Sequence, residues 1–165
     1  MSNIFKTFSL KNIRKVLFSV LLPLVLCEVS TFIVRSKLGV YDVLVLPHIA
    51  PPSRMFGITG TILCVLMGIA SYYIITSTAL PLKRKKITLT LYYTLLALNF
   101  FWGIVFYSWQ LYAFTFIWAV ILFVLTITVT IKFYDISRTA GWLMIPVLAW
   151  MCFAVYLDYM IWMLN

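Results

Sequence analysis

Five apolar runs, each of about 20 residues or more, constrain this chain more than any other feature of its sequence. An α-helix rises 1.5 Å per residue, so about 20 apolar residues cross the roughly 30 Å hydrocarbon core of a bilayer. The chain is 64% apolar and 10% charged, whereas a soluble domain is roughly 45–50% apolar and about 25% charged. We therefore expect an all-α, polytopic membrane protein, a bundle of five transmembrane helices. The predicted spans are residues 16–36, 56–79, 87–107, 111–133 and 139–164.

The 165 residues are interpreted as one membrane domain, residues 1–165. A basic, amphipathic segment, residues 1–15, precedes the first span, and such segments typically lie in the membrane interface. The same basic residues resemble the start of a signal peptide. However, Glu28–Val29–Ser30 offers no small-residue cleavage site, so the first run is interpreted as a retained span.

The connection between the first two spans, residues 37–55, differs from the others in its length. It is too long for a tight turn and too apolar for a solvated linker. The sequence predicts a structured loop that folds back over the bundle, with a short helical turn after Tyr41–Asp42.

The positions of lysine and arginine predict the orientation. Ten of them lie on the side that holds the N-terminus and the second and fourth connections, and three lie on the other side. The bias predicts that the N-terminus lies inside and the C-terminus outside. We expect an integral protein of a bacterial cell membrane. The net charge of +9 does not indicate nucleic acid as a partner, because the basic residues cluster at the ends of apolar runs, where lipid headgroups explain them.

Gly60, Cys64 and Gly68 recur every four residues and so share one face of the second span. In a membrane, such a face of small residues lets another helix or a ligand approach the backbone closely. Cys27, Cys64 and Cys152 lie in apolar runs without metal-ligand spacing, and we interpret them as small packing residues.

Two carboxylates, Glu28 and Asp158, lie within predicted spans at similar depth. Ionisable side chains inside a membrane are costly and usually mark a functional cavity. The alternative is that they reach the interface or pair with Arg35 or Arg54.

Two other polar groups lie deep in the spans. Asn99 shares a face with Gly103 and Phe106, with Trp102 at its edge, and either contacts a pocket or hydrogen-bonds a neighbouring helix. Trp150 shares a face with Ala154, and its N–H needs a partner from another helix or from a ligand. The sequence carries no recognisable catalytic motif or metal-ligand cluster, so no catalytic residue and no metal ligand is predicted.

Short motifs follow one another from the first loop to the end of the chain. They are Val40–Tyr41–Asp42, Pro51–Pro52, Phe56–Gly57, Met67–Gly68, residues 98–102 (LNFFW), Pro146, Trp150 and Leu164–Asn165. In their order and spacing they resemble the TspO/MBR family, the tryptophan-rich sensory or translocator proteins. The match covers nearly the whole chain after the first span.

The resemblance implies a five-helix bundle, often a homodimer, with a pocket beneath the first loop. It implies a hydrophobic small-molecule ligand, such as the tetrapyrroles protoporphyrin IX or haem, and no required cofactor. Carried over by position, Tyr41, Asn99, Trp102 and Trp150 would line this pocket.

Three positions depart from the family pattern. Gly60 and Arg54 stand where family members carry tryptophan, usually at the first position and commonly at the second, and Asp158 replaces the usual asparagine. The missing tryptophan at Gly60 argues against light-dependent porphyrin breakdown. Arg54 would offer a cation to the carboxylates of a porphyrin.

We therefore predict a TspO-like receptor or transporter for a hydrophobic ligand. Two alternatives stay open, namely a light-dependent porphyrin-degrading enzyme that uses Trp150 and Tyr41, and a partner-binding membrane subunit without a small ligand. Glu28 and Asp158 additionally allow a cationic ligand. The predicted site residues are Tyr41, Arg54, Gly60, Asn99, Trp102, Phe106, Trp150, Ala154 and Asp158.

Overall fold

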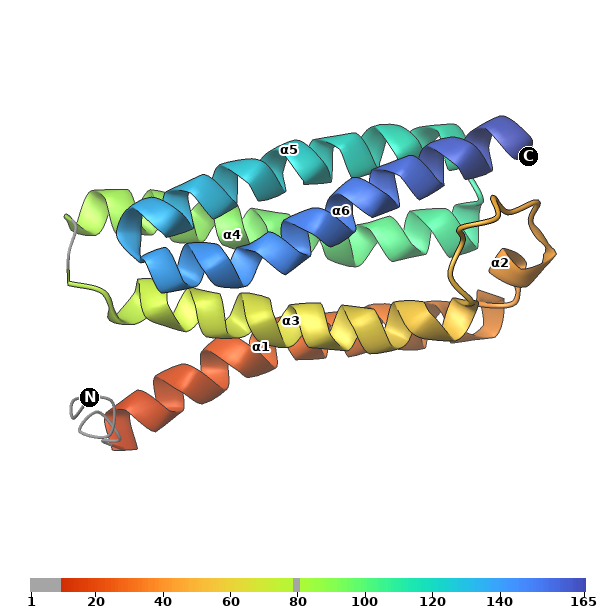
Figure 1. Ribbon diagram of the computed structural model, residues 1–165. Helices are drawn as coiled ribbons and strands as arrows, with labels where there is room; N and C mark the ends of the chain where they lie inside the picture. The colour runs from red at the N-terminus through yellow and green to blue at the C-terminus, as the bar shows by residue number, and fades with distance from the viewer. Residues whose placement is uncertain (1–9, 79–80) are drawn as a thin grey trace.

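The computed structural model describes residues 10–78 and 81–165, so residues 1–9 of the predicted amphipathic segment lie outside it. Within the described residues, five helices are long and apolar enough to cross a membrane, which confirms the predicted all-helical, five-span class (Figure 1). The five helices are α1 (Leu10–Val34), α3 (Ser53–Thr76), α4 (Leu82–Ile104), α5 (Tyr112–Ile136) and α6 (Arg138–Leu164).

Prolines set the start of two of these helices. Helix α3 begins directly after Pro51–Pro52, and α4 begins directly after Pro81. Proline lacks an N–H and has φ fixed near the helical value, so it fits the first positions of a helix. Helix α4 thereby starts earlier than the predicted span. The basic run Lys83–Lys86 lies in its first turns rather than in a connection.

Helix α4 passes into a π-helical turn, η3 (Val105–Trp109), before the chain reverses. Gln110 then takes a left-handed conformation with φ of 54°, and α5 begins two residues later at Tyr112. The predicted spans leave only residues 108–110 for a short connection here. The structure instead has the π-helical turn η3, which buries Phe106 and Tyr107 at this end of the bundle.

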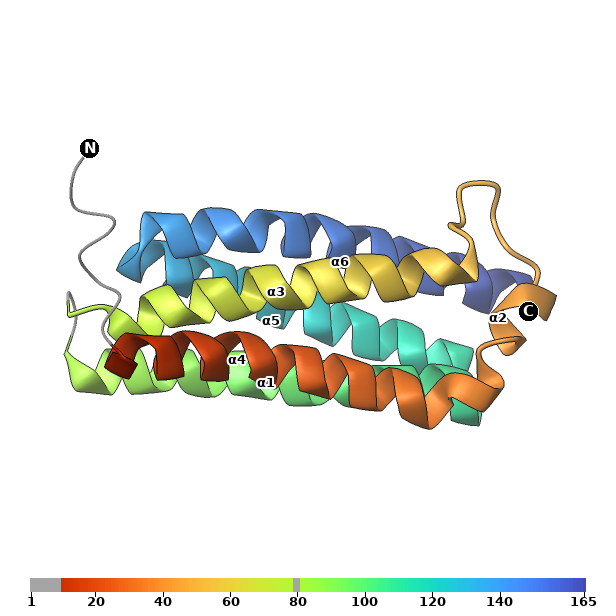
Figure 2. The same ribbon diagram turned by 90° about the horizontal axis from the view of Figure 1, so that it is seen from below.

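The helices form a closed ring. Helix α1 packs against α3 and α4, α3 packs against α6, and α5 packs against both α6 and α4 (Figures 1 and 2). Gly68 marks a close approach of α3 to α1, because a Cβ built on it would lie 2.6 Å from the Val20 Cα. The small-residue face of the second span therefore packs against a helix at Gly68, one of the two alternatives that the sequence left open, whereas Gly60 and Cys64 line the cavity described below.

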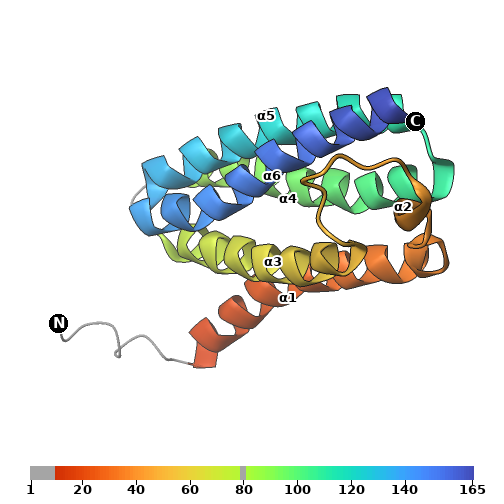
Figure 3. The ribbon, with the colours of Figure 1, turned by 45° about the vertical axis from the view of Figure 1, so that its right-hand side comes forward.

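The first loop covers one end of the ring, which we call the lid end, and the C-terminus of α6 lies at the same end (Figure 3). The loop is partly helical, with a 3₁₀ turn, η2 (Arg35–Lys37), and a short helix, α2 (Val40–Val43). The predicted helical turn thus includes Tyr41–Asp42 instead of following it. Tyr41 is buried among residues of α1, η3 and α6, which ties the loop to the bundle.

Candidate ligand-binding site

A cavity of about 310 Å³ lies inside the ring, and all five long helices contribute to its walls. Its volume is at the lower end of the range for small-molecule pockets, about 300–1,000 Å³. Most of the surface that lines it is apolar. A cavity of this kind can hold an apolar molecule whose few polar groups meet specific partners in the walls.

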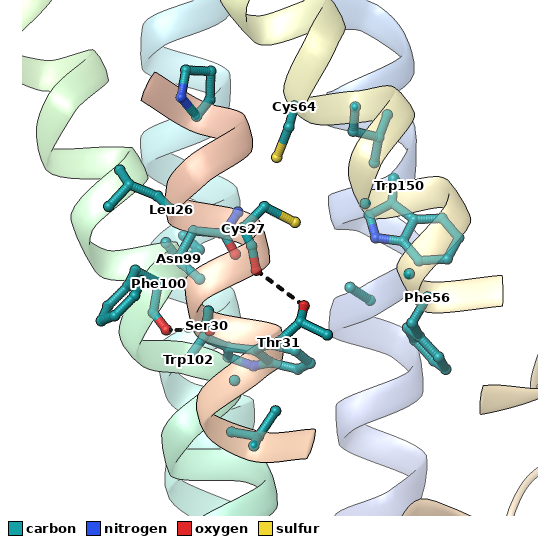
Figure 4. Close-up of a pocket in the computed structure, with 18 of the residues that line it drawn as sticks. Leu26, Cys27, Ser30, Thr31, Phe56, Cys64, Asn99, Phe100, Trp102 and Trp150 are labelled. Atoms are coloured by element: carbon teal, nitrogen blue, oxygen red, sulfur yellow. Dashed lines mark hydrogen bonds between the residues drawn. The ribbon is translucent and has the colours of Figure 1, made fainter. Parts of the chain in front are cut away.

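Six of the nine predicted site residues line this main cavity, and Figure 4 shows three of them on two different walls. Asn99 and Trp102 come from α4, and Trp150 comes from α6. The six are Arg54, Gly60, Asn99, Trp102, Trp150 and Ala154.

The other three predicted residues line a second, much smaller space of about 10 Å³ beneath the lid. They are Tyr41, Phe106 and Asp158. Trp102 and Ala154 line both spaces, so the two spaces adjoin. The structure therefore brings all nine residues to one region but divides them between a main cavity and a lid-side space.

Asn99 and Trp150 each present a polar group without a partner within the described residues. The Asn99 carboxamide makes no hydrogen bond there, so the interhelical bond considered from the sequence is not formed. The Trp150 indole N–H likewise has no acceptor, although its ring contacts Phe56 at a centroid distance of 5.9 Å. Both side chains line the main cavity, so a bound molecule can satisfy them.

Asp158 is buried, at 3% exposure, and accepts a hydrogen bond of 3.0 Å from the Trp102 indole N–H. Its partner is this indole rather than Arg35 or Arg54. Glu28 is exposed instead, and accepts a hydrogen bond of 3.4 Å from the Thr61 hydroxyl. Because Glu28 lines neither space, the two carboxylates do not form one site.

Tyr41 anchors the lid rather than lining the main cavity. Its hydroxyl donates a hydrogen bond of 3.1 Å to the Pro51 carbonyl, and its ring meets Phe56 edge-on at 5.0 Å. Burial raises the pKa of this phenol to about 12, with smaller contributions from the charges of Asp42 and Asp158. The hydroxyl therefore stays a neutral donor at physiological pH.

Asn165 holds the lid from the other side, a role that the sequence analysis did not assign. Its Oδ1 accepts from the Val45 N–H at 3.0 Å, and its Nδ2 donates to the Val45 carbonyl at 3.2 Å. The same Nδ2 donates to the Ile161 carbonyl at 3.0 Å, which fixes the amide on α6. In the sequence, Asn165 stood out only as part of the Leu164–Asn165 motif. Nothing in that motif indicates a contact with Val45, 120 residues away.

Metal binding has little support in the part of the chain that the structure describes. No group of three or more histidine, cysteine, aspartate or glutamate side chains there could hold a metal ion. The chemistry that these walls offer is apolar and aromatic contact, hydrogen-bonding groups such as those of Asn99 and Trp150, and the cation of Arg54.

Five spans arranged around a partly open cavity, with a folded loop over one end, define a polytopic helical membrane protein with a pocket inside its bundle. The chain belongs to the TspO/MBR family, whose sequence model matches residues 19–163. It is 30% identical over 155 residues to the tryptophan-rich protein TspO of Archaeoglobus fulgidus, covering 93% of this chain and 99% of that protein.

Two further relatives come from distant organisms. Identity to the tryptophan-rich protein TspO of Chlorobaculum tepidum is 29% over 136 residues, covering 82% of this chain and 85% of that one. Identity to the human translocator protein is 28% over 136 residues, covering 82% and 80% of the two chains. The resemblance drawn from the sequence motifs is thereby confirmed at the level of the family.

Proposed function

We propose that this protein is a membrane receptor or transporter that binds a hydrophobic, planar ligand of the tetrapyrrole class, such as protoporphyrin IX or haem, in the main cavity. The observation that carries the proposal is the combination of aromatic walls with the unpaired polar groups of Asn99 and Trp150 in one cavity.

Aromatic side chains favour a flat, conjugated ligand. The Trp102 and Phe106 rings are stacked, with centroids 5.4 Å apart and an interplanar angle of 26°. Trp102 also lines the main cavity, where its ring can contact a second flat ring. A macrocycle would thus gain apolar burial and ring contacts from the same wall.

The unpaired polar groups favour a ligand with hydrogen-bonding atoms. A ligand that covers a donor or acceptor without pairing with it incurs a cost of about 1–3 kcal/mol, so a ligand that pairs with both side chains is favoured and takes a fixed orientation. Asn99 offers both a donor and an acceptor, and Trp150 offers a donor. The nitrogens of a tetrapyrrole and its carboxylates are groups that these side chains can pair with.

Arg54 supports a ligand that carries carboxylates. It lies in the first turn of α3, is exposed, and lines the cavity near the lid. The N-terminus of a helix carries a partial positive charge, which adds to the attraction of the guanidinium for an anion. The carboxylates of a porphyrin would therefore face Arg54 while its rings enter the cavity.

The test is a titration of the purified protein in detergent with protoporphyrin IX, followed by quenching of tryptophan fluorescence. We expect saturable binding that Asn99→Leu weakens about tenfold, equal to about 1.4 kcal/mol. Arg54→Ala should weaken binding of the free acid but leave binding of the dimethyl ester unchanged, because the ester lacks the carboxylates. Arg138→Ala, at the far end of the bundle, serves as the matched control. Equal affinities for all variants would refute this site.

The same preparation separates the alternative functions. Loss of porphyrin absorbance under light, faster than for free porphyrin in detergent, would support the enzyme. Absence of quenching by protoporphyrin IX and by haem would support a partner-binding subunit.

The orientation and the oligomeric state are proposals too. The distribution of lysine and arginine supports an N-terminus inside the cell and a lid outside. The homodimer rests on family resemblance alone and stays a prediction.

A further inference from the structure

Two thiols meet in the wall of the main cavity. Cys27 of α1 and Cys64 of α3 both line this cavity, and their side chains point into the space between the two helices (Figure 4). A Cβ built on Gly60, one turn before Cys64, would lie 3.6 Å from the Cys27 sulfur. The Cys27 side chain therefore packs on the face of α3 that carries Gly60 and Cys64.

We propose that Cys27 and Cys64 form an oxidisable dithiol site, in which a hydroperoxide converts the two thiols into a disulfide that joins α1 to α3. A disulfide requires its sulfurs at about 2.05 Å and its Cα atoms within about 7 Å. Because the Cys27 sulfur packs on the face of α3 that carries Cys64, side-chain rotation and a small helix shift can bring the two sulfurs together.

The chemistry balances with a hydroperoxide as the named oxidant. One sulfur attacks the peroxide, the O–O bond breaks, and the products are a sulfenic acid and an alcohol (water if the oxidant is hydrogen peroxide). The second thiol then attacks the sulfenic sulfur, the S–S bond forms, and the hydroxyl leaves as water with the thiol proton. The two sulfurs together lose two electrons, and the peroxide oxygens gain them.

The surroundings favour a disulfide over a two-thiolate metal site. A disulfide replaces two neutral thiols with a neutral group, whereas a bound soft metal requires thiolate anions in an apolar wall. A third metal-ligating side chain beside this pair is absent within the described residues. Two neutral thiols in an apolar wall therefore favour a disulfide. A closed metal site would need thiolate anions and further ligands.

A disulfide here would fix one wall of the cavity. Helix α1 contributes Leu26 and Ser30 to the lining, and α3 contributes Phe56 and Gly60. A covalent bond between Cys27 and Cys64 would hold these surfaces together. The reaction itself does not depend on which ligand the cavity holds, so it can be tested separately from porphyrin binding.

The test uses the full-length protein in detergent, treated with cumene hydroperoxide and then denatured in the presence of a maleimide. Intact mass reports how many of the three cysteines remain free. We expect the count to fall from three to one in the wild type, and from two to zero in Cys152→Ser. Cys152 is exposed on α6 and lines neither space, so this variant is the matched control. Dithiothreitol should restore the reduced count.

Cys27→Ser and Cys64→Ser should each abolish the intramolecular crosslink. If either variant fails to fold, peptide mapping of the oxidised wild type still decides the question, because it identifies which cysteines are joined. Three free thiols after oxidation, a disulfide through Cys152, or oxidation to sulfinic acid without a crosslink would each overturn the proposal.

Discussion

The indole N–H of Trp102 on α4 donates a hydrogen bond of 3.0 Å to the carboxylate of Asp158 on α6. Helices α4 and α6 are not neighbours in the ring, so this bond crosses the bundle beneath the lid. Trp102 lines both the main cavity and the lid-side space, and Asp158 lines only the latter. The bond therefore fixes the indole that separates the two spaces.

Removing the acceptor at position 158 should destabilise the bundle. Asp158→Leu leaves the Trp102 N–H without a partner at a buried position, and we expect a loss of about 1–3 kcal/mol. Asp158→Asn keeps an acceptor oxygen and should unfold at or above the wild-type temperature, because it also removes a buried charge. Thermal unfolding in one detergent measures both. Equal stabilities for the leucine and asparagine variants would contradict the role assigned to the bond.

Gly68→Ala should disrupt the contact between α1 and α3. The added methyl group would lie 2.6 Å from the Val20 Cα and 2.8 Å from the Ser19 carbonyl oxygen, and backbone cannot rotate away as a side chain can. We expect a cost of about 1–3 kcal/mol, typical of overpacking, measured as a lower midpoint of thermal unfolding.

Gly57→Ala is the matched control on the same helix. A Cβ built on Gly57 has no neighbour within 4 Å. Alanine favours a helix by about 1 kcal/mol relative to glycine, so this variant should be neutral or more stable. A Gly68→Ala protein as stable as Gly57→Ala would show that α1 and α3 are less closely packed.

Asn165→Ala should release the lid while leaving the bundle folded. The substitution removes both hydrogen bonds to Val45, each worth about 0.5–1.5 kcal/mol. We expect faster hydrogen exchange at the Val45 amide and faster dissociation of a bound porphyrin. Asn165→Asp keeps the acceptor for the Val45 N–H but loses the donor, so its exchange rate should be intermediate. Unchanged hydrogen exchange at the Val45 amide in the alanine variant would show that Asn165 does not hold the lid in place.

Gly60→Trp should fill part of the main cavity. Gly60 lines the cavity, and the nearest atom to an added Cβ is the Cys27 sulfur at 3.6 Å, so a large side chain can extend only into this space or displace Cys27. If the ligand occupies the cavity, affinity for protoporphyrin IX should change about tenfold or more, equal to about 1.4 kcal/mol.

Ile58→Trp provides the comparison, since Ile58 is 65% exposed on the same helix and lines neither space. Its affinity should equal that of the wild type. Equal binding by both tryptophan variants would place the ligand outside the cavity. Faster loss of porphyrin absorbance under light in Gly60→Trp alone would link position 60 to the photochemistry that the family resemblance implies.

The sequence named residues that line the two spaces, but it did not predict their contacts. Asn99 and Trp150 stood out because polar groups are costly inside a span, and Tyr41 and Trp102 entered through family motifs. Nothing local identified Trp102 as the partner of Asp158, because the two residues are 56 positions apart. The position of Cys27 against the face of α3 that carries Gly60 and Cys64 was missed for the same reason, since each cysteine alone has the pattern of a small packing residue.

The sequence by itself determined the five spans, because a helix satisfies its own backbone hydrogen bonds and its crossing of a membrane depends only on local length and composition. It also determined the family and the folded loop. Only the tertiary structure decided which faces of α1, α3, α4 and α6 meet. The physical reason is that helix rotation and register are set by contacts between distant residues, such as Gly68 against Val20 and Asn165 against Val45. Those contacts place Asp158 under the lid and Glu28 on the outside of the bundle.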